Sequence, residues 1–174
     1  MTFIPTTPNL GLPAITDHSV AVSTMFAGGR TPGARLGQII TAIDPTYGTG
    51  EFIYLKGLDT TGVGSWVTYN ADDFSTTLLA ANAIGPVAVA MSACVTGEYG
   101  WYQISGKAVG KALALYADDG LVWATSTGGS VDDAVVDGDM VHLAKGASAV
   151  GTPSAGLAEF EISRPYTDDI ASND

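Results

Sequence analysis

Side chains that carry out chemistry or bind metals are scarce in this sequence. Its 174 residues include one cysteine, Cys94, and two histidines, His18 and His142. One cysteine cannot form an intrachain disulfide or a zinc cluster, and two histidines cannot form a three-histidine metal site. The Gly-x-Ser-x-Gly pattern of a nucleophile elbow is absent as well. We therefore expect no catalytic residues, no cofactor and no metal ligands, and we predict that the protein is not an enzyme.

Positive charge is also scarce. The sequence contains seven Lys and Arg and 18 Asp and Glu, which gives a net charge of −11. Nucleic acid and anionic membrane surfaces are bound through Lys and Arg that displace counterions, so we expect neither as a partner. The longest uncharged stretch, residues 74–97, contains polar residues and a central Gly85-Pro86, and it predicts soluble core rather than a membrane span. Residues 1–13 fit neither a signal peptide nor a transit peptide.

Glycine, in contrast, is abundant and interrupts almost every long helical window. The 22 glycines are spread along the chain. Between them, short runs rich in aromatic and β-branched residues predict strands. We expect strands at residues 51–55, 64–69, 87–95, 101–105, 108–116, 121–125, 140–144 and 158–163. Residues 87–95 alternate between two largely apolar faces, which predicts a strand covered on both sides, with Val87, Val89, Met91, Ala93 and Val95 toward the core. The predicted fold class is all-β, a compact sandwich or barrel of short strands.

The two ends of the chain differ from this pattern. Residues 1–33 contain four prolines and apolar residues without a strand or helix period, and they predict an extended N-terminal arm with a hinge at residues 28–33. The arm could pack on its own domain or on another molecule, and the sequence does not separate the two. Residues 34–167 form the predicted β-rich body, and residues 168–174 form an acidic tail.

Acidic residues gather most densely at Asp132, Asp133, Asp137 and Asp139. Carboxylates at this spacing can bind calcium, but the fixed ligand pattern of a calcium loop is absent. Each acidic pair also lies beside a turn signal, where Asp side chains accept backbone hydrogen bonds. We therefore interpret these residues as turn formers. Cys94 has no Lys, Arg or His near it in sequence, so we expect an inert, buried thiol.

One stretch of the body carries a family resemblance. Residues 85–91, followed by residues 99–108 with the distinctive run Gly100-Trp101-Tyr102-Gln103-Ile104-Ser105-Gly106, resemble virion structural proteins of tailed bacteriophages. They look like the capsid decoration, or cement, group. Residues 50–57, 66–70 and 146–156 fit the same pattern, so the resemblance spans about residues 36–165. It implies a β-rich protein, made in the bacterial cytoplasm, that binds the outer capsid surface without catalytic residues or a cofactor.

From the resemblance we expect binding at subunit junctions that stabilises the shell. The partners would be the major capsid protein and further copies of this chain, as a homodimer or homotrimer. We predict capsid contacts from the apolar arm residues Phe3, Ile4, Leu10, Leu12 and Ile15. Two alternatives stay open: a tail or connector accessory protein, and a carbohydrate-binding β-module. The latter would use one of these aromatic residues as a stacking platform: Trp66, Tyr69, Tyr99, Trp101 or Tyr102.

Overall fold

The computed structural model describes residues 1–6, 11–20, 22–23 and 30–170, and every regular element in this part of the chain is a β-strand. The all-β prediction is therefore confirmed. The strands are β1 (Ile4–Pro5), β2 (Ser19–Val20), β3 (Val22–Ser23), β4 (Arg30–Thr31), β5 (Ile39–Asp44), β6 (Gly48–Lys56), β7 (Trp66–Tyr69), β8 (Thr76–Leu78), β9 (Gly85–Ala90), β10 (Glu98–Lys111), β11 (Leu121–Ala124), β12 (Val131–Asp132), β13 (Met140–Gly146) and β14 (Leu157–Thr167). No helix long and apolar enough to cross a membrane occurs in the described residues.

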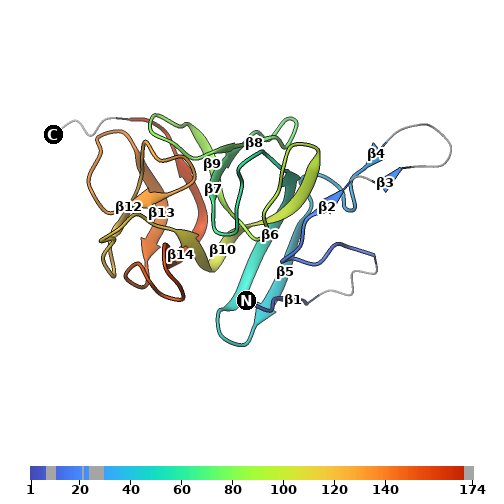
Figure 1. Cartoon of the computed structure of the whole chain (residues 1–174), viewed down its shortest axis with the longest axis horizontal. Helices are drawn as coiled ribbons and strands as arrows, with labels where there is room; N and C mark the ends of the chain where they lie inside the picture. Colours follow the sequence, from blue (N-terminus) through green and yellow to red (C-terminus); the bar gives the residue numbers. More distant parts are fainter. Residues whose placement is uncertain (7–10, 21, 24–29, 171–174) are drawn as a thin grey trace.

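Twelve of these strands form one open antiparallel sheet. The main order is β1-β5-β6-β10-β9-β14-β13-β11-β12; β2 pairs with β10, β7 pairs with β8 and β9, and β10 also pairs with β14. The short strands β3 and β4 pair with each other. In Figure 1, β12 and β13 lie toward one end of the molecule, and β3 and β4 lie at the opposite end, next to β2.

Strand β10 connects the two parts of the sheet. Its first half pairs with β6 from Tyr99 to Ser105, and its second half pairs with β14 from Ser105 to Lys111. The register against β6 shifts between Gln103 and Ser105, and Gly106 follows with a φ of +95°. This left-handed conformation suits glycine, so the strand can bend where it changes partner.

The apolar side chains form three clusters. The arm-side cluster contains Phe3, Ile15, Ala34, Ile40, Ala42, Phe52, Tyr54, Met91 and Trp101. The central cluster contains Ile53, Leu55, Val67, Ala88, Ala90, Tyr102 and Ile104. The distal cluster is built around Trp66, Tyr116 and Phe160, at the end where β11 to β14 lie. Alternate residues of β6 therefore enter different clusters, and this strand is buried on both faces.

Two strand predictions need correction at their ends. Val87 to Ala90 are buried on both faces of β9, as predicted, but the strand stops at Ala90, and Ala93 and Val95 are exposed. The strand expected over residues 108–116 ends at Lys111. Leu115 has a φ of +75°, which is incompatible with extended backbone, so the chain turns there.

Candidate functional site

The arm residues predicted as capsid contacts separate into buried and exposed side chains. Phe3 and Ile15 are buried in the arm-side cluster. Leu12 packs against the same cluster and is partly buried, whereas Ile4 is 59% exposed. Leu10 lies outside the described residues. Residues 1–6 and 11–20 of the arm thus contact the chain's own body through β1, β2 and these apolar side chains, and Ile4 is the described contact residue that faces solvent.

Polar contacts fix the arm in place as well. The Trp101 indole Nε1–H donates to the carbonyl oxygen of Pro13 at 3.1 Å, and the hydroxyls of Ser19 and Tyr54 are hydrogen-bonded. The rings of Phe3 and Phe52 meet edge to face, with centroids 4.8 Å apart. Since Trp101 and Tyr54 are fully buried, these contacts satisfy groups that would otherwise lie unpaired beneath the arm.

Asp44 joins the start of the arm to the turn after β5. Its carboxylate accepts the backbone N–H of Thr2, and those of Thr46 and Tyr47 at 2.8 and 3.0 Å. Burial by itself would raise the pKa of Asp44. The three N–H donors outweigh burial and hold the pKa below its usual value of 3.8.

Three large aliphatic side chains are exposed on the two loops that follow β10 and β12. Leu115 is 91% exposed, Val135 75% and Val136 40%, and we call these three residues the loop surface. The two loops adjoin, because the Ala117 N–H donates to Asp133 Oδ2 at 2.9 Å.

The backbone of Leu115 is in the left-handed conformation, which costs an L-residue about 1–2 kcal/mol. The next residue, Tyr116, is buried and donates its hydroxyl to the Gly120 carbonyl at 2.9 Å, which fixes the turn.

Three of the four acidic residues singled out in the sequence accept backbone hydrogen bonds. Asp133 accepts the Ala117 N–H, Asp132 accepts the Asp133 N–H at 3.0 Å, and Asp139 is buried and accepts the Asn82 N–H. Across the described residues, no group of three or more His, Cys, Asp and Glu side chains could hold a metal ion. Only the bond of Asp132 is local, as expected of a turn former, whereas Asp133 and Asp139 accept N–H groups from distant segments and join separate parts of the chain.

The chain's single thiol is buried, and its two imidazoles lie apart from each other. Cys94 is buried, as predicted, and burial raises the pKa of its thiol, so the unreactive form is favoured. His18 lies 3.5 Å from Glu98, near the pairing of β2 with β10, and His142 lies 3.4 Å from Asp168 at the end of β14. Each histidine therefore belongs to a different part of the sheet.

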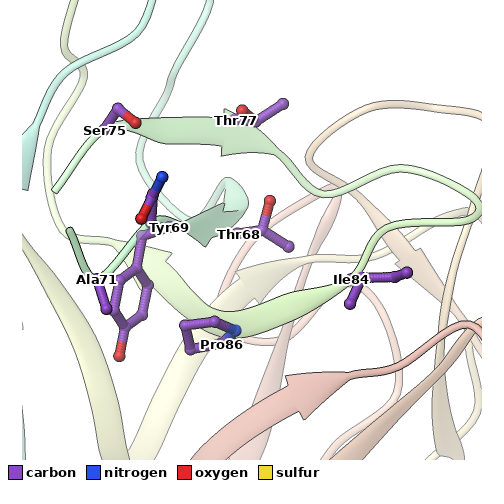
Figure 2. A pocket seen from close by; sticks show the side chains of 8 residues that line it. Thr68, Tyr69, Ala71, Ser75, Thr77, Ile84 and Pro86 are labelled. Atoms are coloured by element: carbon purple, nitrogen blue, oxygen red, sulfur yellow. The ribbon is translucent and has the colours of Figure 1, made fainter. Parts of the chain in front are cut away.

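An open groove of about 440 Å³ lies where β7, β8 and β9 meet. Figure 2 shows Thr68 on β7, Thr77 on β8, and Ile84 and Pro86 at the start of β9 around one space, with the ring of Tyr69 at its edge. The complete lining is Thr68, Tyr69, Asn70, Ala71, Ser75, Thr77, Ile84 and Pro86. The size falls in the range of ligand sites, roughly 300–1,000 Å³. No local pattern in the sequence predicts this groove, although Tyr69 is a predicted platform residue, because three segments form it only after the strands pair.

The other aromatic candidates for ligand stacking are mostly unavailable. Trp66, Trp101 and Tyr102 are fully buried, so their ring faces cannot meet a ligand in this fold. Tyr99 and Tyr69 are partly exposed, and Tyr69 is the one that lines the groove. The structure therefore places one of the five predicted platform residues beside the groove of Figure 2.

Comparison with known proteins identifies no relative. No protein-family model matches the chain, and no curated protein or solved structure is significantly similar to it.

Proposed function

We propose that this chain is a virion structural protein that binds the outer surface of a phage capsid at subunit junctions and stabilises the shell. The resemblance of residues 36–165 to decoration proteins supports this proposal. The loop surface is the observation that carries it. Leu115 is held in a strained conformation with its side chain in water, and a contact made on an assembled shell would offset that cost.

Binding to the assembled shell would stabilise it by mass action. A protein that binds the shell but not its separated subunits shifts the equilibrium toward the shell, and many weak identical contacts add up. The partners in this proposal are the major capsid protein and further copies of this chain, and no catalysis is involved. Phe3 and Ile15 would contribute indirectly, because they hold the arm that presents Ile4.

Charge indicates what the shell should offer at the binding site. In the described part of the chain, four basic side chains are already paired with carboxylates: Lys56 with Asp73, Lys107 with Glu159, Lys145 with Asp119, and Arg164 with Glu51. With a net charge of −11, the remaining surface is strongly acidic. A shell site with Lys or Arg around an apolar recess would complement the loop surface and the carboxylates beside it.

Reconstitution on shells assembled without this protein tests the proposal. We expect saturable binding of the purified chain and a higher temperature of shell disruption. Leu115→Asp should lower occupancy at a fixed protein concentration, because it places a charge in the contact. Val63→Asp, at another exposed aliphatic residue, is the charge-matched control and should bind like the unaltered chain. Failure of the unaltered chain to bind any shell would contradict the proposed function.

A further inference from the structure

The groove of Figure 2 is free of charge, although the chain around it is acidic. None of its eight lining residues carries a formal charge. Close by, Asp73 accepts the Ser75 hydroxyl at 2.7 Å and pairs with Lys56 at 3.2 Å. The hydrogen bonds from Ser75, with Lys56 adding a smaller effect, lower the pKa of Asp73 to about 2, so this carboxylate is ionised at neutral pH. The lining itself offers an anionic ligand no basic partner, and the two cations beside it, Lys56 and Arg164, are already paired with Asp73 and Glu51.

Two threonine hydroxyls are placed to bind a polar ligand. Thr68 and Thr77 are directly opposite each other in the pairing of β7 with β8, so both side chains lie on one face of the ladder. Neither hydroxyl is hydrogen-bonded to another described residue, and Thr77 is exposed. Asn70 lines the groove beside them; its side-chain Oδ1 accepts the Asp72 N–H at 2.8 Å, which leaves its NH₂ group as a donor. These groups can both donate and accept hydrogen bonds at the ligand.

Apolar surface adjoins the hydroxyls. Ile84 is 70% exposed, Pro86 is partly exposed, and the half-buried ring of Tyr69 closes the edge of the groove. Burial raises the pKa of Tyr69, so its phenol stays protonated at neutral pH and can donate a hydrogen bond. Hydroxyl and amide groups beside an aromatic ring suit ligands that have both hydroxyls and C–H faces. A sugar ring combines these two kinds of surface.

We propose that this groove is a binding site for a neutral saccharide, with Thr68 and Thr77 bonded to sugar hydroxyls and Tyr69, Ile84 and Pro86 against its C–H face. The site does not depend on the shell-binding proposal, since it lies on β7 to β9 and the loop surface follows β10 and β12.

Titration of the isotope-labelled full chain, followed by NMR, tests the saccharide site. The probes are three neutral disaccharides, maltose, lactose and chitobiose, with inorganic phosphate as the anionic comparison. We expect at least one disaccharide to cause saturable amide shifts in residues 68–71, 75–77 and 84–86, and phosphate to leave these amides unchanged. If none of the three disaccharides shifts them, if the shifts map elsewhere, or if phosphate binds there, the proposal is overturned.

Matched substitutions establish which hydroxyls bind. Thr77→Val keeps the shape and strand preference of an exposed residue but removes its hydroxyl, and should weaken disaccharide binding about fivefold, the effect of one lost hydrogen bond. Thr68→Val should act in the same direction. Thr49→Val, at an exposed threonine on β6, is the control and should bind like the unaltered chain. Unchanged affinity in both groove variants would also overturn the proposal, and the amide spectrum of each variant verifies its fold.

Discussion

Gly106 shows how far a single residue can determine this fold. It lies in β10 directly after the register shift, in a left-handed conformation, and a Cβ added there would lie 2.3 Å from the carbonyl oxygen of Thr49 on β6. Backbone cannot move aside as easily as a flexible side chain. Gly97 has a similar φ of +91° but no neighbouring atom within 4 Å of the added Cβ. Substitution at Gly97 therefore measures the cost of the positive φ alone, whereas substitution at Gly106 adds steric overlap with Thr49.

We predict that Gly106→Ala lowers the free energy of unfolding by about 2–4 kcal/mol, because both costs apply. Gly97→Ala should lower it by about 1 kcal/mol, from the positive φ alone. Urea denaturation of both variants measures the difference. Equal losses would show that the contact with Thr49 does not constrain β10.

Asp44 gives a prediction that depends on pH. The pKa of its carboxylate is lower in the folded chain than the unfolded value of 3.8, so its contribution to stability is present above pH 3.8 and is lost as pH falls through the folded pKa. Asp44→Asn should therefore lower the free energy of unfolding by about 1 kcal/mol near neutral pH. The loss should shrink as the pH falls below 3.8. Urea denaturation across this range tests the sign, and a loss that grew with acidity would contradict it.

At the scale of elements, the arm acts as a cover for one face of the sheet. Phe52, Tyr54 and Trp101 form that face, and Phe3 and Ile15 pack over it. We predict that Phe3→Ala lowers the free energy of unfolding by about 3 kcal/mol, because it leaves a cavity against Phe52. Ile4→Ala, one residue along and exposed, should change it by less than about 0.5 kcal/mol. Urea denaturation of both variants measures these losses. If Phe3→Ala lowered the free energy of unfolding as little as Ile4→Ala, the arm would not stabilise the body.

The loops at the opposite end should show a conflict between stability and binding. Asn tolerates the left-handed conformation better than Leu, so Leu115→Asn should raise the free energy of unfolding by about 0.5–1 kcal/mol. The same change removes an exposed apolar side chain and should lower shell occupancy. Denaturation and shell binding of one preparation measure both effects. A variant that gained stability and still bound fully would remove Leu115 from the contact.

For the whole molecule, local patterns in the sequence predict most strands, but they do not predict the turns and the groove that depend on contacts between distant segments. Alternation identifies Val87 and Val89 as core residues of β9, and both are buried. The strand expected through Leu115 is wrong in its last residues, because burial of Tyr116 and pairing with the next loop impose a turn that no local signal marks. The groove depends on the pairing of Thr68 with Thr77 and Val87, which only the folded sheet specifies.

Copy number per particle is the most direct test of the central proposal, that this protein works by adhesion to a repeated shell lattice. We predict that quantitative mass spectrometry of purified virus particles finds the chain in hundreds of copies, in a fixed ratio to the major capsid protein. A handful of copies would instead indicate a tail or connector position. Its absence from purified particles would contradict the account.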